Sequence, residues 1–497
     1  MSLLKNVNGK NPRQIAVRIL QQRRADGGFT EDLLENALAG VQFAPADRAL
    51  CQEIVYGVVR WQATLDWLIA RNTGGRKQKP TLQNLLRLGL YQIFWLDRIP
   101  GHAAVNETVE LAKQNGFGAQ AGFVNAVLRG YLREADATKK LLADLKISQP
   151  ALGWSHPEWL VARWQQRWGL KRTTQLLAWN NTPPKTFARV NRLKTDAGRL
   201  LEKWREEGVE YDFVRSNFFG RADPALRDQD ARPRVPTDFE NLVFELKSHP
   251  PLAKLESFRE GWFYIQDPST LLAAYKLGAR SGETILDLCA APGGKTTFIA
   301  QLMNNQGRIV AMDNSRDRLK LLEENCARLG VTCVELATHD LLRPHPALLP
   351  QEREPQRATH ENSNQGRSAN RLTAIPPLPT GEGRGEGKLF DRILVDAPCS
   401  NTGVMRRRLD LRWRIQPAEI QRLRDLQLDL LKRAALHVKS DGVLVYSTCS
   451  LEPEENSEVV KQFLREHKNF ELEGEYELLP FADNADGAFV AALVKAR

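Results

Sequence analysis

The stretch Ile285-Leu286-Asp287-Leu288-Cys289-Ala290-Ala291-Pro292-Gly293-Gly294-Lys295-Thr296 decides the fold of the second half of this 497-residue chain. Its apolar start predicts a buried strand, and the small residues that follow predict a tight loop that opens a helix. In such a loop the backbone N–H groups can approach a ligand closely, at the carboxyl end of a parallel strand. The stretch therefore predicts a ligand-binding loop within an α/β fold.

The end of this stretch, Gly294-Lys295-Thr296, also resembles the end of a phosphate-binding Walker A loop. That motif requires a glycine five positions before its last glycine, and Cys289 stands there instead. No clear Walker B partner follows in the sequence. An RNA-stimulated P-loop NTPase is therefore the weaker interpretation.

Strands and helices alternate on both sides of the loop. The predicted strands are Thr284–Leu288, Arg308–Asp313, Thr332–Leu336, Phe390–Asp396 and Gly442–Ser447. Amphipathic helices are predicted between them, for example over Ser315–Leu329 and Pro417–Val438. This alternation is typical of a parallel sheet with helices on both faces.

Two aspartates are placed to meet a nucleotide-like ligand. Asp313 ends the second predicted strand, where an acidic residue can bind ribose hydroxyls of NAD or S-adenosylmethionine, although an aspartate there can equally cap a helix. Asp340 follows the third strand and could reach an adenine amino group or cap a turn.

Two cysteines follow strands at the same predicted sheet edge, in Asp396-Ala397-Pro398-Cys399 and Ser447-Thr448-Cys449-Ser450. A single cysteine after a strand is usually a small core residue. Two of them beside a ligand-binding loop indicate chemistry instead, because a partly exposed thiol can act as a nucleophile.

Methylation of cytosine at C5 needs such a thiol. C5 is a poor nucleophile until a thiolate adds to C6 and makes C5 electron-rich, after which C5 can take the methyl group of S-adenosylmethionine. A carboxylate near N3 supports protonation of the ring, and Asp396 is placed for that role. Loss of the C5 proton, to water or to a carboxylate, then lets the thiolate leave. The base must be splayed out of any stack to be reached.

Composition and charge favour a soluble globular protein with an anionic partner. The formal net charge is +10, which favours nucleic acid, although a solvated basic surface fits the charge equally well. The six cysteines include no C-x-x-C pair and no His cluster accompanies them, so no metal site is expected. The sequence lacks an apolar run suited to a signal peptide or a membrane span. We expect free thiols in the cytoplasm.

The four motifs together resemble a known family. DLCAAPGGKTT, VAMD, VDAPCSNTG and VYSTCSLEPEEN resemble the Sun/Fmu (Nol1/Nop2/Sun) RNA m5C methyltransferases. The resemblance implies that Cys449 is the nucleophile, that Cys399 assists product release, and that S-adenosyl-L-methionine is the cofactor. The implied cofactor contacts are Cys289, Ala290, Ala291, Pro292, Gly293, Gly294, Lys295, Asp313, Asp340 and Asp396.

The first half of the chain is predicted to be helical from about Pro12 to Arg133. RALCQEIVYGVVRW, IPGHAAVNETVELAK and GFVNAVLR resemble the NusB-like helical domain of the bacterial members of this family that act on 16S ribosomal RNA. The resemblance implies 16S ribosomal RNA as the partner, naked or in an early small-subunit particle, and a specific cytosine, number 967 of that RNA, as the target. We expect no membrane partner, and we expect the chain to be a monomer.

These patterns predict a multidomain chain. We expect an all-α NusB-like domain over 1–135, linker helices and a small α/β RNA-recognition subdomain over 136–265, and a class I (Rossmann-like) methyltransferase domain over 266–497. Within the last, 350–389 is predicted to be a disordered insertion, because it has almost no residues that could form a core.

Three features depart from the family pattern: the 350–389 insertion, Asn401 in place of the usual alanine, and Gly487-Ala488-Phe489 in place of Gly-Phe-Phe. A second alternative is an RNA-binding factor with an inactive catalytic half, but both thiols and all three cofactor carboxylates are present. The run Arg406-Arg407-Arg408 suits either a phosphate grip or a solvated loop.

Overall fold

The computed structural model describes residues 11–25, 28–214, 242–338 and 389–497. Asp340 and residues 350–388 of the predicted insertion lie outside the described residues. The chain divides into two compact units, one of Met1–Pro184 with Val404–Ile415 and the other of Lys185–Gly403 with Gln416–Arg497. In the described part of the chain, no helix is long and apolar enough to cross a membrane.

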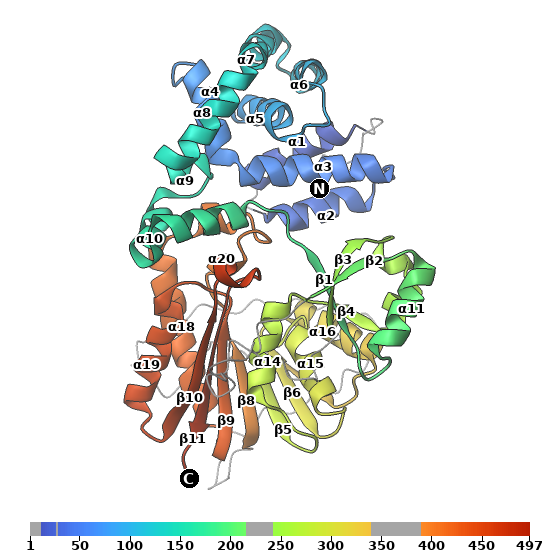
Figure 1. The fold of residues 1–497 in the computed structure, drawn as a ribbon, viewed down its shortest axis with the longest axis vertical. Helices are drawn as coiled ribbons and strands as arrows, with labels where there is room; N and C mark the ends of the chain where they lie inside the picture. The colour runs from blue at the N-terminus through green and yellow to red at the C-terminus, as the bar shows by residue number, and fades with distance from the viewer. Residues whose placement is uncertain (1–10, 26–27, 215–241, 339–388) are drawn as a thin grey trace, which may run out of the picture. The chain divides into compact units, whose positions relative to one another are not determined.

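The first unit is helical, which confirms the all-α prediction for the amino-terminal domain (Figure 1). Its helices are α1 (Pro12–Ala25), α2 (Thr30–Ala39), α3 (Pro45–Arg60), α4 (Gln62–Asn72), α5 (Pro80–Trp95), α6 (Gly101–Gln114), α7 (Ala121–Arg133), α8 (Ala135–Ser148), α9 (Pro150–Gly153), α10 (Glu158–Asn180) and α17 (Leu411–Arg414). Several begin with proline, which fits the first turn because its missing N–H would have no helical partner there. Buried side chains such as Ile54, Leu86 and Leu128 belong to one continuous core.

Residues 404–415 belong to the helical unit, although they follow the Cys399 loop in the sequence. Arg412 is fully buried, and its guanidinium donates to the carbonyls of Arg60, Ser155 and Asn180 and to Oδ1 of Asn181. Burial and the charge of Arg60 lower the pKa of Arg412 to about 9. The 404–415 segment is therefore part of the helical fold.

The arginine run in this segment is buried at its first residue and exposed at its last. Arg406 is 2% exposed, and its guanidinium lies 4.1 Å from the ring centroid of Trp179. Arg408 forms an ion pair with Glu31 at 3.2 Å. Both interpretations of the run, phosphate grip and solvated loop, are therefore wrong for Arg406, because packing onto a tryptophan removes its charge from the surface.

Replacing Arg412 with methionine should destabilise the helical unit by about 3 kcal/mol or more, because the buried acceptors lose a charged donor. Urea unfolding followed by tryptophan fluorescence measures this change. The matched control is Arg408→Met: its ion pair is largely exposed, so the loss should stay below about 1 kcal/mol. Equal midpoints for the two variants would contradict a structural role for Arg412.

The second unit contains a small antiparallel sheet of order β2-β3-β1-β4. Its elements are β1 (Thr186–Val190), α11 (Ala197–Glu207), β2 (Glu210–Phe213), β3 (Val243–Ser248), α13 (Glu256–Arg259) and β4 (Phe263–Ile265). Its core surrounds Trp204, which packs edge-on against Phe244 and Phe263. Asp196 caps the start of α11 and Gly208 ends it in the left-handed conformation.

The larger sheet of this unit has seven strands in the order β10-β11-β9-β8-β5-β6-β7. They are β5 (Thr284–Leu288), β6 (Arg308–Asp313), β7 (Val334–Thr338), β8 (Phe390–Asp396), β9 (Val438–Thr448), β10 (Phe470–Leu478) and β11 (Ala488–Lys495). Strands β7, β6, β5, β8 and β9 pair in parallel, whereas β11 runs antiparallel to β9 and β10 antiparallel to β11. The class I methyltransferase fold is thus confirmed, with two antiparallel strands that the sequence interpretation did not place.

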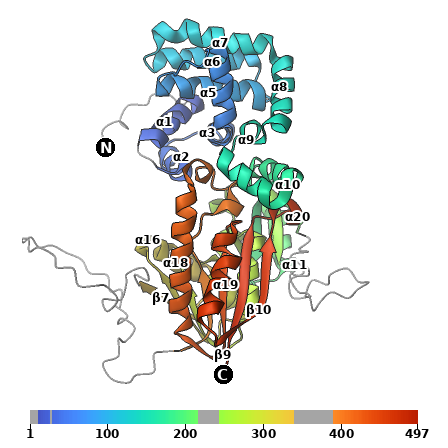
Figure 2. The same cartoon turned by 90° about the vertical axis from the view of Figure 1, so that its left-hand side faces the viewer.

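Helices cover both faces of this sheet (Figures 1 and 2). The helices are α14 (Leu271–Leu277), α15 (Gly294–Leu302), α16 (Arg316–Leu329), α18 (Pro417–Ala435) and α19 (Ser457–Glu466), with the short α20 (Pro480–Asp483) before β11. Ile285 faces the core shared with α14, α15 and α16, and Leu286 faces the core shared with α18 and α19. This alternation follows from the two-residue period of a strand, and it leaves the carboxyl ends of the strands for the site.

Candidate functional site

The loop after β5 is shaped by residues with unusual backbone conformations. Cys289 has φ 62°, and Gly293 has φ 103° at the residue that precedes α15. A side chain at Gly293 would approach Leu322 to 2.9 Å, so glycine suits both the conformation and the space. The backbone N–H of Ala290 donates to Met312, which ties the loop to β6. Burial raises the pKa of Cys289 to about 12, so its thiol stays neutral.

Asp313 lies at the end of β6, directly beside this loop. Its carboxylate accepts from the backbone N–H of Ala291 at 3.2 Å and of Ser315 at 3.0 Å, and it pairs with Arg318 at 3.3 Å. The residue that caps α16 is Ser315, whose hydroxyl accepts from Arg318 N–H. Asp313 is therefore not the helix cap, and its carboxylate lies at the carboxyl end of β6 against the loop.

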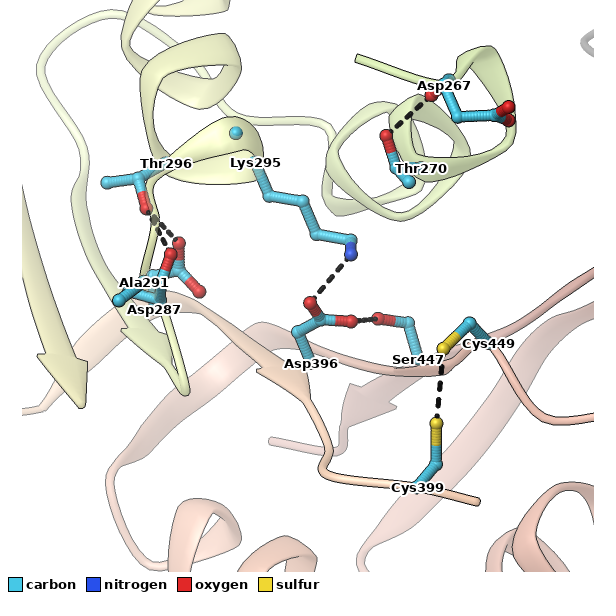
Figure 3. A network of polar contacts seen from close by, with 12 residues as sticks. Asp267, Thr270, Asp287, Ala291, Lys295, Thr296, Asp396, Cys399, Ser447 and Cys449 are labelled. Carbon is cyan, nitrogen blue, oxygen red and sulfur yellow. Dashed lines mark hydrogen bonds and ion pairs between the residues drawn. The ribbon is translucent and has the colours of Figure 1, made fainter. Parts of the chain in front are cut away.

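Asp287 is a fully buried carboxylate that the sequence interpretation did not single out. Its Oδ2 accepts from the Thr296 hydroxyl at 2.7 Å, whereas its Oδ1 has no hydrogen-bond partner among the described residues (Figure 3). Burial raises the pKa of Asp287 to about 7, and the charges of Asp396 and Asp313 act in the same direction. A buried carboxylate oxygen without a donor is costly, so a cationic or donor group would stabilise it.

Lys295 joins the loop after β5 to the neighbouring strand β8. Its Nζ lies 2.7 Å from Oδ2 of Asp396, at the end of β8, and the Ser447 hydroxyl donates to Oδ1 of the same carboxylate at 2.8 Å (Figure 3). Burial alone would lower the pKa of Lys295, but the charge of Asp396 and the hydrogen bond to it raise the pKa above its usual value. Lys295 therefore stays charged and fixes the orientation of Asp396.

Arg189 on β1 supports the same loop from the small sheet. Its guanidinium is buried and donates to the Gly294 carbonyl at 2.8 Å and to the Thr297 hydroxyl at 3.0 Å. Burial lowers its pKa to about 9. An arginine within a strand carries no motif, so the sequence did not reveal this contact.

The two cysteines meet at the ends of the neighbouring strands β8 and β9. The Sγ atoms of Cys399 and Cys449 are 3.3 Å apart (Figure 3). Cys399 is 9% exposed, and Cys449 is half-buried and so more accessible to a substrate. The thiols therefore have unequal access, although they lie in contact.

The surroundings of Cys399 favour its protonated form. The hydrogen bond to Cys449 raises the pKa of the Cys399 thiol well above its usual value, and burial and the negative charge of Glu455 raise it further. Cys399 therefore keeps its proton and can donate it to the neighbouring sulfur. Cys449 in turn donates to Oδ1 of Asn401 at 2.9 Å.

Asn401, the departure from the family's alanine, takes a left-handed conformation with φ 57°. Asparagine tolerates this region because its short polar side chain bonds locally, and here Nδ2 donates to the Cys399 carbonyl at 2.6 Å. The next glycine, Gly403, packs so closely that a side chain there would lie 2.6 Å from the Cys449 carbonyl. The loop that carries Cys399 is therefore fixed against the loop that carries Cys449.

The structure brings most of the predicted site residues to one sheet edge. Cys289 to Lys295, Asp313, Asp396, Cys399 and Cys449 all lie at the carboxyl ends of β5, β6, β8 and β9. Asp340 is not among the described residues. Asp287, Arg189, Ser447 and the buried Glu455 are further polar residues of this region that the sequence interpretation missed.

A mostly parallel seven-stranded sheet with this loop and these carboxylates at its strand ends defines the chain as a class I methyltransferase. Comparisons with known proteins agree. Residues 274–494 match the family described as 16S rRNA methyltransferase RsmB/F, residues 10–133 the NusB family, and residues 156–217 the ferredoxin-like domain of RsmF/B-like methyltransferases.

Full-length relatives narrow the class to a family. The chain is 36% identical to the probable ribosomal RNA small subunit methyltransferase B of Synechocystis sp., over 97% of this chain and 99% of that protein. It is 34% identical to the ribosomal RNA small subunit methyltransferase B of Escherichia coli, over 98% and 99%. The chain therefore belongs to the ribosomal RNA small subunit methyltransferase B family, as the motifs predicted.

Solved structures show the same fold. The crystal structure of PH0851 matches with a TM-score of 0.69 at 23% identity, over 97% of this chain and 99% of that one. NSun6 from Pyrococcus horikoshii, solved with the S-adenosylmethionine analogue SFG, matches with a TM-score of 0.50 at 25% identity, over 69% of this chain and 98% of that one.

Proposed function

We propose that the chain transfers a methyl group from S-adenosyl-L-methionine to C5 of one cytosine of 16S ribosomal RNA, by resemblance cytosine 967, in the cytoplasm and as a monomer. The observation that carries this proposal is a pair of thiols 3.3 Å apart with unequal access, of which the less accessible one, Cys399, has a raised pKa. One accessible nucleophile beside one protonated thiol is what addition to a base and later release require.

The residues at the strand ends suit this cofactor. S-adenosylmethionine carries positive charge, and Asp287, Asp313 and Asp396 present carboxylates around the loop, one of them with the unpartnered Oδ1. Asp313 would hold the ribose hydroxyls, and the Cys289–Lys295 loop would lie against the cofactor through its backbone. The bound cofactor supplies an electrophilic methyl group.

The chain's own residues act on the base. The Cys449 thiolate gives an electron pair to C6, and the C5–C6 π electrons move toward C5. Asp396, held by Lys295 and Ser447, would support protonation at N3. After C5 has taken the methyl group and lost its proton to water, the C5–C6 double bond reforms and the Cys449 sulfur leaves. The Cys399 S–H, 3.3 Å away, donates to that departing sulfur.

The substrate is supported by the relatives, which match over almost the full chain and are named as ribosomal RNA small subunit methyltransferases. The net charge of +10 suits an RNA partner, because lysine and arginine neutralise phosphates. We propose 16S ribosomal RNA, as naked RNA or within an early small-subunit particle, as the partner.

The test is transfer of labelled methyl from S-adenosyl-L-methionine to unmodified 16S RNA, with 23S RNA as the control. We expect label in 5-methylcytidine from 16S RNA alone, and the same assay on early particles tells which form is the better substrate. Label in another nucleoside would overturn the C5 assignment. No label on RNA or particles would favour the alternative of a binding factor.

Cofactor affinity should depend on the protonation of Asp287. Its pKa is raised to about 7, so the carboxylate is partly protonated near neutral pH, whereas a cationic ligand favours the ionised form. Affinity for S-adenosyl-L-methionine should therefore rise by about eightfold from about pH 6 to about pH 7.5 if the ionised form alone binds.

Equilibrium dialysis without RNA measures this dependence, with Asp287→Asn as the control. The variant keeps the size of the side chain but cannot titrate, so its profile should reflect the cofactor's own groups and be flatter. Parallel profiles for the two proteins would rule out Asp287 as the titrating group.

A further inference from the structure

Glu455 is a buried carboxylate between the two cysteine loops. It ends the short helix η8 (Pro453–Glu455), five residues after Ser450 on the chain, and it is 0% exposed. Ser400 directly follows Cys399, and Ser450 directly follows Cys449. The carboxylate therefore lies next to both reactive loops without being accessible to a substrate.

Its two oxygens receive donors from both loops. Oε1 accepts from the Ser400 backbone N–H at 2.8 Å and from Gln427 Nε2 at 3.0 Å. Oε2 accepts from the Ser450 hydroxyl at 2.6 Å and from the Ser400 hydroxyl. All of these donors are neutral, so the bonds gain strength from the charge of the carboxylate.

The surroundings hold this arrangement from outside the loops. Gln427 on α18 also donates to the Pro398 carbonyl at 2.9 Å, and the Tyr446 hydroxyl on β9 donates to the Glu455 carbonyl at 2.6 Å. Burial raises the pKa of Glu455, and the donors from Ser400, Ser450 and Gln427 oppose that shift. The network favours the ionised form against the cost of burial.

We propose that Glu455 is a positioning residue that fixes the distance between the Cys399 and Cys449 thiols. This inference rests on the proposed function, because it assigns the fixed distance to the release step. Attack on C6 needs the Cys449 sulfur alone, whereas release also needs the Cys399 proton near the departing sulfur. Loss of Glu455 therefore slows release more than it slows attack.

A first experiment measures the proximity of the two thiols in the absence of RNA. Phenylarsine oxide joins two neighbouring thiols through two As–S bonds and loses one water, so its capture rate reports their proximity. Glu455→Gln should slow capture by about tenfold, because charge-assisted bonds that hold the loops are lost. The control Glu458→Gln neutralises an exposed carboxylate of α19 outside this network and should capture at the wild-type rate. Cys399→Ser gives the background from the other cysteines.

A second experiment measures how much enzyme accumulates as a covalent RNA adduct during the reaction. Glu455→Gln, incubated with 16S RNA and cofactor, should hold a larger fraction of enzyme as a denaturation-resistant RNA adduct than wild type, and Glu455→Asp, which keeps the charge, should hold less than the glutamine variant. Cofactor binding should be unchanged in each. Should Glu455→Gln not fold, Ser450→Ala removes one donor to the same carboxylate and should show the smaller change in the same direction.

The positioning role would be overturned if Glu455→Gln captured phenylarsine oxide at the wild-type rate and held the same adduct fraction as wild type. A wild-type protein that methylates no RNA would contradict the proposed function instead. The rates of capture by phenylarsine oxide would still show whether Glu455 fixes the distance between the two thiols.

Discussion

The variant Cys449→Ala is expected to lose methyl transfer to 16S RNA by at least about 1,000-fold, because C5 of cytosine is not activated without addition to C6. Its affinity for S-adenosyl-L-methionine should remain within about twofold of wild type, since the loop proposed to bind the cofactor lies between β5 and α15 and does not include Cys449. A labelled-methyl assay and equilibrium dialysis measure the two quantities on the same preparation.

The matched control is Cys333→Ala, which removes another partly buried free thiol from the same unit, at the amino end of β7 and away from the carboxyl strand ends that carry the site. This variant should turn over normally. Turnover retained in Cys449→Ala would remove Cys449 from the mechanism, and loss of turnover in both variants would point to a general effect of removing thiols.

The variant Cys399→Ala is expected to fail at the release of the methylated product. Cys449 can still attack, but the departing sulfur has no proton donor, so a covalent protein–RNA adduct should become the main form of the enzyme. Gel electrophoresis under denaturing conditions shows this adduct as a slowly migrating band. Cys399→Ser keeps a hydroxyl donor at the same position and should release product faster than the alanine variant.

A double variant separates this outcome from unspecific crosslinking. Cys399→Ala combined with Cys449→Ala should form no adduct, because the nucleophile is gone. An adduct in the double variant, or none in Cys399→Ala, would contradict the role assigned to Cys399.

The bounds of three strands and the meeting of the thiols could be predicted from the sequence, whereas the predicted bounds Thr332–Leu336 and Gly442–Ser447 were wrong for β7 and β9. β5, β6 and β8 have the predicted bounds, because each is an apolar run bordered by turn residues. The approach of Cys399 to Cys449 follows from topology: both residues come after strands, and parallel strands end at one edge of a sheet. Because β8 and β9 are direct neighbours in the sheet, the two residues lie close together, and their Sγ atoms are 3.3 Å apart.

Other features depend on contacts that no local pattern encodes. Glu455 lies in a Pro-Glu-Glu-Asn stretch that reads as a polar surface turn, and its burial requires Ser400 and Gln427 from distant parts of the chain. The 404–415 segment likewise reads as a basic loop, yet Arg412 and Asp410 complete the helical unit, where Asp410 accepts from the N–H of Thr30 at 2.6 Å. Burial of these charges is decided by the partners available after folding.

The measurement that tests the central claim most directly uses 16S RNA containing 5-fluorocytidine. Fluorine at C5 cannot leave as a proton, so an enzyme that attacks C6 and methylates C5 remains bound to the RNA. Digestion and mass spectrometry of the trapped wild-type complex then identify the attached cysteine. The nucleotide is expected on the peptide that contains Cys449, and only with cofactor present. Attachment to Cys399, or no attachment to either thiol, would contradict the mechanism.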